Sequence, residues 1–128
     1  SKINFTGPLT PSQMLEQYLK CNVYVLPSCI ENSPNSLGEA MKLGVPSVAA
    51  CVGGVQDMIK DKIDGFIYPF DESYMLAYYV CQIFKNNDIV EKISKNAIES
   101  SSKRFNPEEV KNRTIDIYDY AYDYLHKE

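Results

Sequence analysis

The chain has 128 residues, 45% of them hydrophobic and 23% charged, a composition typical of one soluble globular domain rather than a fibre, a repeat array or a disordered tail. Its 17 acidic residues outnumber its 13 basic ones, and the net charge of −4 argues against a surface that holds nucleic acid or anionic membrane by charge. Every apolar run is far shorter than the ~20 residues that cross a bilayer, so we expect no membrane span in this segment.

Cysteine and histidine usage excludes several kinds of site. The cysteines include no pair at C-x-x-C spacing, which argues against a zinc ribbon or a thioredoxin motif. We interpret all four as buried free thiols, typical of the cytosol, namely Cys21, Cys29, Cys51 and Cys81. The one histidine, His126, stands near the C-terminus and does not supply a two-histidine metal site or a histidine-based triad. The first residues lack the pattern of a secretory signal, and we expect a cytoplasmic protein from its free thiols.

The first half of the chain alternates strand-like runs with helical patterns, which predicts a parallel sheet built from βαβ units. Residues 3–6 are the first strand candidate. Thr10 then begins a helix as its N-cap, with Pro11 at the first helical position and Gln13 completing a capping box. The unbroken apolar run at residues 23–26 predicts a strand that is buried on both faces.

A second helix and a third strand follow this buried strand. Ser33 before Pro34 repeats the arrangement of a cap followed by proline, and we expect the helix to run to Leu43, with Gly44 beyond its end. Its predicted buried face consists of Leu37, Ala40 and Met41. Residues 45–50 are then the next strand candidate.

The next segment contains a glycine pair and the last predicted strand. We interpret Gly53-Gly54 as a plain turn from strand to helix, with close approach to a ligand as the alternative. A short helix at residues 55–60 and a strand at residues 65–68 follow. Asp71 is then expected to cap a helix with a single apolar face. That face comprises Met75, Leu76, Tyr79, Val80, Ile83 and Phe84.

The remainder of the chain is predicted to be helical. One helix covers residues 87–102, and Asn106 caps a last helix that reaches about Leu125. The expected core face of the last helix consists of Val110, Ile117, Ala121 and Leu125. Helical geometry spreads its four tyrosines around the axis, namely Tyr118, Tyr120, Tyr122 and Tyr124. They either lie at a helix surface or dock against another domain or chain.

Two carboxylates follow the buried strand, eight positions apart. Ligands of open parallel sheets bind beyond the carboxyl ends of the strands, where this segment lies. Glu31 is in the loop and Glu39 is on the helix flank away from Leu37, so the core needs neither. We expect phosphates at the amides of Asn35, Ser36 and Leu37, and ligand hydroxyls at the two acids. A sugar nucleotide has both groups, although two such glutamates also occur by chance.

Several short motifs occur in order within residues 5–68. They are Leu26-Pro27-Ser28, Glu31, Glu39-Ala40-Met41, Gly44-Val45-Pro46, Gly53-Gly54-Val55-Gln56-Asp57-Met58-Ile59 and Asp64-Gly65-Phe66. Together they resemble the donor-binding domain of retaining GT-B glycosyltransferases of group 1, the GT4 family. The resemblance implies a partial Rossmann-like α/β/α fold of three layers, with a short parallel sheet and a helical C-terminal half.

The resemblance also implies roles for single residues. Glu31 is the catalytic residue beside the donor sugar and diphosphate, and Glu39 holds the ribose hydroxyls. Pro34 has no N–H to donate, and many members instead have Gly-Phe-Gly after the first glutamate. The remaining donor contacts therefore fall to Asn32, Ser33, Asn35 and Ser36. We expect no metal and no other cofactor, because the proposed site has no D-x-D pair and no cluster of histidine and cysteine.

In the family, an arginine and a lysine that stabilise the leaving diphosphate precede the strand that residues 3–6 resemble. We therefore expect residues 1–128 to be a single domain, the C-terminal part of an enzyme, inactive without the N-terminal acceptor domain. Its partners are a nucleotide sugar and a glycan or lipid-linked acceptor, in polysaccharide or glycolipid synthesis in the cytoplasm or at the inner face of the membrane. The alternative is a non-catalytic flavodoxin-like or GT-B-derived binding or assembly module. In the truncated sheet, residues 3–6 either pair with residues 23–26 or leave an edge that a second copy covers.

Overall fold

The computed structural model describes residues 2–126 and has a parallel α/β sheet at its centre. The strands are β1 (Tyr24–Leu26), β2 (Ser47–Ala50) and β3 (Phe66–Tyr68), in the spatial order β1-β2-β3. Each strand pairs with the next one along the chain, with Tyr24 opposite Ser47 and Val48 opposite Phe66. The predicted class of fold is therefore confirmed.

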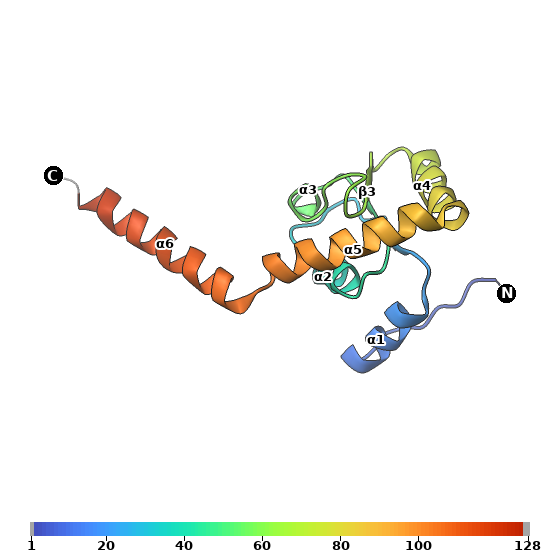
Figure 1. Ribbon diagram of the computed structural model, residues 1–128, viewed down its shortest axis with the longest axis horizontal. Helices are drawn as coiled ribbons and strands as arrows, with labels where there is room; N and C mark the ends of the chain where they lie inside the picture. The colour runs from blue at the N-terminus through green and yellow to red at the C-terminus, as the bar shows by residue number, and fades with distance from the viewer. Residues whose placement is uncertain (1, 127–128) are drawn as a thin grey trace.

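Three helices lie between or before the strands and three follow them. They are α1 (Pro11–Lys20), α2 (Asn35–Lys42), α3 (Val55–Met58), α4 (Ser73–Lys85), α5 (Asn87–Arg104) and α6 (Pro107–Leu125). Figure 1 shows α5 lying along the body against α2, with α4 at one end. From the other end of α5, α6 leads away from the body.

Alternate residues of the sheet supply two separate cores, as a pleated strand with both faces covered requires. Ala49 of β2 packs with Leu37 of α2 and Val55 of α3 on one face. Val48 and its neighbours pack with Tyr79 of α4 on the other face. The three predicted buried residues of α2, namely Leu37, Ala40 and Met41, are all buried.

The predicted N-cap residues are confirmed for α1 and α6 and wrong for α2 and α4. The capping box of α1 is present, because the Gln13 amide donates to Thr10 Oγ1 at 3.4 Å and the Thr10 amide donates to Gln13 Oε1 at 2.9 Å. The Asn106 side chain caps α6, as predicted. Ser33 does not cap α2, because the N-cap position is Pro34, one residue later, and no side chain caps it. The N-cap of α4 is likewise Glu72 and not the predicted Asp71, and the Glu72 side chain makes no capping hydrogen bond.

The predicted strand at residues 3–6 is wrong, because this segment forms neither a strand nor a helix. Ile3 is 68% exposed and Phe5 is 90% exposed. A four-residue segment has no stable strand conformation without a neighbouring strand to pair with. The described sheet consists of β1, β2 and β3, and residues 3–6 are not one of its strands.

The burial expected of α6 and of the cysteines is also wrong. None of the α6 residues, all of them in the described part of the chain, is buried, including the predicted core face of Val110, Ile117, Ala121 and Leu125. The helix packs against the end of α5 and extends beyond the sheet layers that would cover it (Figure 1). All four cysteines are free, as predicted, but Cys51 is half-buried and Cys21, Cys29 and Cys81 are exposed. These three lie at a helix end, in a loop and on an outward helix face.

Candidate functional site

The loop between β1 and α2 carries the first of the two acids and lies at the carboxyl end of the sheet. Glu31 in this loop is half-buried, whereas Glu39, within α2, is exposed. The loop also contacts the next one along the sheet, because the Gly54 amide donates to the Asn32 carbonyl at 2.9 Å. Two successive βα loops therefore form one continuous edge.

The glycine pair sets the position of the Glu31 loop. A Cβ atom on Gly53 would collide with the Glu31 carbonyl oxygen, and one on Gly54 would collide with the Asn32 carbonyl oxygen. Gly53 also has φ of +47°, a conformation that favours glycine. The pair therefore does more than form a plain turn, because it lets the backbone after β2 approach the backbone that carries Glu31.

Two tyrosines, which the sequence did not single out, hold the first turns of α2. The Tyr18 hydroxyl of α1 lies 3.1 Å from the Ser36 carbonyl oxygen and 3.3 Å from Glu39 Oε2. The Tyr24 hydroxyl of β1 lies 2.8 Å from Ser36 Oγ. Their rings meet edge to face, with centroids 5.8 Å apart. Glu39 is thus held by a neighbouring helix as well as by its own.

The pKa values of these two tyrosines are raised in the folded protein. Burial raises the pKa of Tyr24, and the negative charges of Glu31 and Glu39 raise it further, while the hydrogen bond with Ser36 acts in the opposite sense. Burial likewise raises the pKa of Tyr18, with added effects from Tyr24 and Glu39. Both carboxylates therefore act in the same direction on the Tyr24 hydroxyl.

The backbone at the start of α2 offers two amides to a ligand. The Leu37 and Gly38 amides both donate to the Pro34 carbonyl, at 3.1 and 3.3 Å. The amides of Asn35 and Ser36 have no acceptor within residues 2–126. Leu37, named among the expected phosphate donors, is fully buried and its amide is already paired, so the structure gives it a place in the core.

The other predicted binding residues lie at the surface of this edge. Asn32, Ser33 and Asn35 are exposed and Ser36 is half-buried. Ser33 Oγ lies 3.9 Å from the sulfur of Met58, the last residue of α3. The structure therefore gathers polar side chains from the loop and the first turn of α2 beside the two free amides.

Glu39 stands between two shallow hollows. One, of about 190 Å³, is lined by Asn35, Gly38, Glu39, Lys42 and Phe105. The other, of about 250 Å³, is lined by Leu9, Pro11, Met14, Leu15, Tyr18, Glu39 and Leu43. Over residues 2–126, no three side chains of His, Cys, Asp or Glu are grouped as metal ligands. Within the same residues, no helix has the length and apolarity to cross a membrane.

Solved structures of the same fold define the class of protein. Sucrose-phosphate synthase from Thermosynechococcus elongatus is 26% identical, with a TM-score of 0.81 over 93% of this chain and 30% of that chain. HepE of Anabaena in complex with UDP-glucose is 23% identical, with a TM-score of 0.75 over 84% of this chain and 30% of that chain. The fold is that of the C-terminal domain of a GT-B glycosyltransferase.

Sequence comparison gives the family. The model of the family described as glycosyl transferases group 1 matches residues 1–100, and the chain belongs to that family. A similar relative, the uncharacterised glycosyltransferase MJ1607 of Methanocaldococcus jannaschii, is 26% identical over 125 residues, which are 97% of this chain and 32% of that protein. The chain therefore spans about a third of the length of this relative.

Proposed function

We propose that the chain is the donor-binding part of a retaining glycosyltransferase and holds a nucleoside-diphosphate sugar at the edge formed by the β1–α2 loop. The observation that carries this proposal is the pair of unpaired amides, of Asn35 and Ser36, at the start of α2, with Glu31 in the loop before them and Glu39 one turn further along the helix. Carboxylates accept hydrogen bonds from sugar hydroxyls, and helix N-terminal amides donate to phosphate. HepE, which has the same fold, was solved with UDP-glucose, and this supports the proposed class of ligand.

Glu39 is the proposed acceptor for the ribose hydroxyls of the nucleotide. Its carboxylate is exposed beside two hollows, and the Tyr18 hydroxyl at 3.3 Å restrains it. A restrained acceptor loses less conformational entropy when a ligand hydroxyl binds it. The nucleoside would lie on this side of α2.

Glu31 and the phosphate donors serve the reacting end of the ligand in this proposal. The acceptor hydroxyl attacks the anomeric carbon on the face from which the diphosphate leaves, the bond to the diphosphate breaks, and the hydroxyl proton passes to the departing diphosphate, so the sugar is transferred with retention. The amides of Asn35 and Ser36 and the side chains of Asn32 and Ser33 donate to the diphosphate. Glu31 lies on the sugar side, held by the approach of Gly53.

The wider role follows from the family resemblance and belongs to the same proposal. The acceptor is a glycan or lipid-linked sugar bound by a further domain, and the product enters a polysaccharide or glycolipid. We place the reaction in the cytoplasm or at the inner face of the membrane. The chain alone transfers no sugar, because the proposed site has amides and carboxylates but no cation among its predicted binding residues. Independence from divalent metal stays a prediction.

The test is a calorimetric titration of the intact protein with UDP-, GDP- and ADP-sugars. Loss of the ribose acceptor in Glu39→Ala should weaken nucleoside diphosphate binding by about 1–3 kcal/mol. Glu31→Ala should reduce transfer more than it reduces binding of the free diphosphate. The matched control is Glu91→Ala, at an exposed position of α5. Unchanged nucleotide binding by Glu39→Ala would contradict the ribose assignment.

A second candidate, a non-catalytic binding or assembly module, is favoured by one observation. The long helix α6 presents its apolar residues to solvent, as a surface for assembly would. The two candidates differ in chemistry, because only the first cleaves the donor. Release of nucleoside diphosphate from a donor sugar by the intact protein, abolished in Glu31→Ala, would favour the enzyme.

A further inference from the structure

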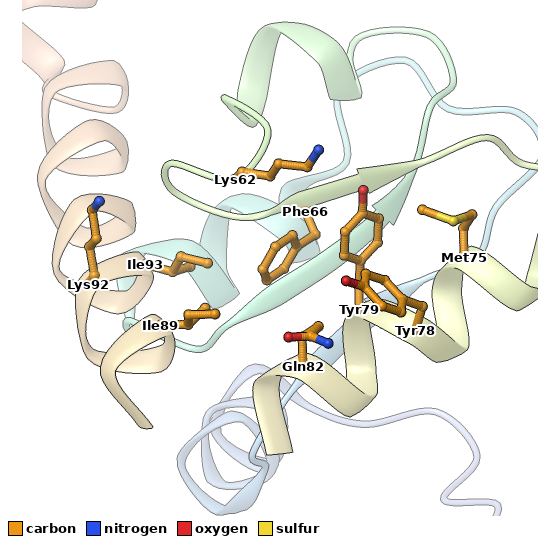
Figure 2. A pocket seen from close by; sticks show the side chains of 9 residues that line it. All are labelled: Lys62, Phe66, Met75, Tyr78, Tyr79, Gln82, Ile89, Lys92 and Ile93. Atoms are coloured by element: carbon orange, nitrogen blue, oxygen red, sulfur yellow. The ribbon is translucent and has the colours of Figure 1, made fainter. Parts of the chain in front are cut away.

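A larger hollow than those beside Glu39 lies between β3, α4 and the start of α5. Its volume is about 410 Å³. It is lined by Lys62, Phe66, Met75, Tyr78, Tyr79, Gln82, Ile89, Lys92 and Ile93, as Figure 2 shows. It shares no residue with the proposed donor site, so donor binding does not account for it.

Aromatic rings form the floor and one wall of this hollow. Phe66 of β3 and Tyr79 of α4 stack with centroids 4.7 Å apart and planes 19° apart. Tyr78 meets Tyr79 edge to face at 5.5 Å. Phe66 and Tyr79 are each 6% exposed, whereas Tyr78 is 53% exposed and free to contact a ligand. Such walls favour a flat apolar body that offers a face or an edge to the rings.

The charged side chains that line the hollow are all positive. Its lining contains Lys62 and Lys92 and no carboxylate, although the whole chain carries a net charge of −4. Figure 2 shows Lys62 passing beside Phe66 with its ammonium end toward Tyr79, while Lys92 lies along α5, with Ile89 and Ile93 between it and the rings. Lys62 Nζ lies 3.8 Å from Asp61 Oδ2 in a loose, solvent-exposed ion pair. Lys62 and Lys92 are both exposed, so an anion that approaches the hollow meets positive charge on the β3 side and on the α5 side.

The two lysines belong to elements that are fixed to each other. The turn that carries Lys62 is closed by its amide, which donates to the Gly65 carbonyl at 2.7 Å. Asp64 Oδ1 accepts from the Lys60 amide, also at 2.7 Å, and Asp64 is 2% exposed. Asn96 of α5 then donates to the Ile63 carbonyl at 2.8 Å, which ties the turn to the helix that carries Lys92. The backbone positions of the two lysines are thus fixed relative to each other before any ligand binds.

We propose that this hollow binds a small organic anion with a flat apolar body. The apolar body lies against Phe66, Tyr78 and Tyr79, and the carboxylate, phosphate or sulfonate head pairs with the Lys62 ammonium group, while Lys92 adds positive charge from the α5 side. Charge complementarity selects the anion, because a cation is repelled by both lysines and a neutral molecule gains nothing from either. The Gln82 amide, on the same lining, can donate a hydrogen bond to the anionic head.

The experiment compares two probes of the same shape, naphthalene sulfonate and naphthyl methanol, by calorimetry on the full chain. The sulfonate should bind the unmodified protein more tightly than the alcohol. Lys62→Gln and Lys92→Gln should each weaken sulfonate binding by about two- to tenfold and leave the alcohol unchanged. The matched control is Lys95→Gln, at an exposed lysine of α5 outside the lining, which should change neither.

A second variant tests the aromatic wall. Tyr78→Ala truncates an exposed side chain and should weaken both probes, while the thermal unfolding midpoint stays close to that of the unmodified protein. Equal binding of the two probes to the unmodified protein would overturn the proposed selection for anions. Equal losses in Lys95→Gln and Lys62→Gln, or unchanged binding in Tyr78→Ala, would overturn the location.

Discussion

Helices α2 and α6 differ in a way that the strength of their local signals does not explain. The eight residues of α2 have no side-chain cap, yet four of them are buried. The 19 residues of α6 begin with an asparagine cap and two acids in the first turn, yet none of them is buried. The family match includes α2 and ends at residue 100, before α6 begins. Helix formation is therefore decided locally, whereas burial is decided by the elements that neighbour the helix.

The strongest test of this contrast removes one apolar side chain from each helix. Leu37→Ala should destabilise the protein by about 2–5 kcal/mol, because a fully buried residue leaves a cavity. Ile117→Ala in α6, where the side chain is 68% exposed, should cost less than about 1 kcal/mol. Urea unfolding followed by far-UV circular dichroism measures both. Equal losses would show that α6 is packed in solution.

A second test extends the contrast to the glycines that support the packed region. Gly54 has an ordinary φ of −75°, so Gly54→Ala should cost about 1–3 kcal/mol through collision with the Asn32 carbonyl. Gly7 in the exposed N-terminal segment has φ of +66° and no atom near its missing Cβ. Gly7→Ala therefore reports backbone strain alone and should cost about 1 kcal/mol. The same urea titrations measure both, and a smaller loss for Gly54→Ala than for Gly7→Ala would contradict the close approach.

The parts of the fold that sequence predicts well are those that neighbouring residues decide. The capping box at Thr10 and the helix end at Gly44, which has φ of +72°, depend on a few adjacent positions and are confirmed. The order of strands also follows from the alternation of apolar runs. The predictions of a strand at residues 3–6 and of a buried face on α6 failed, because both require a partner surface that no local pattern encodes.

The candidate site was predictable in outline and not in detail. Glu31 and Glu39 stand out by their spacing after a buried strand, and the structure has one in the β1–α2 loop and the other within α2. The contact of Tyr18 with Glu39 joins residues 21 positions apart and depends on how α1 crosses α2. The sequence shows Tyr18 as one more apolar position on a helix stripe. Only the packed structure shows that its hydroxyl reaches a carboxylate.

A third prediction concerns what covers the exposed apolar residues of α6. We expect copies of the chain to associate through this helix, because its apolar side chains are otherwise left in water. Ile117→Asp should weaken that association by at least about tenfold, and Asp123→Asn on the polar side should leave it nearly unchanged. Sedimentation velocity over a range of concentrations measures it. A monomer at every concentration would refute the self-association.

The smallest expected effect is a pH dependence that separates a packed tyrosine from an exposed one. Tyrosine in the unfolded chain ionises at about pH 10, and burial raises the pKa of Tyr18 in the folded protein. The folded state then binds more protons, so stability is full below about pH 10 and falls as the pH rises. We expect this loss to be about 1 kcal/mol between about pH 9 and pH 11.

The matched variants for this effect are Tyr18→Phe and Tyr120→Phe. Tyr18→Phe should reduce the loss of stability between about pH 9 and pH 11. Tyr120 of α6 is 71% exposed, so Tyr120→Phe should keep the slope of the unmodified protein. Unfolding free energies from urea titrations at several pH values give both slopes. A steeper slope for Tyr18→Phe would reverse the sign of the argument.

The hydrogen bond from the Gly54 amide to the Asn32 carbonyl has a consequence for the timescale of motion at this edge. This amide lies outside the helices and the strand ladders, so its exchange with deuterated solvent reports the separation of the two loops. An amide of β2, such as that of Val48, instead exchanges only when the sheet opens. A ligand resting on the Glu31 loop would therefore lengthen the exchange lifetime of the Gly54 amide first. The two lifetimes together would separate loop opening from unfolding of the domain.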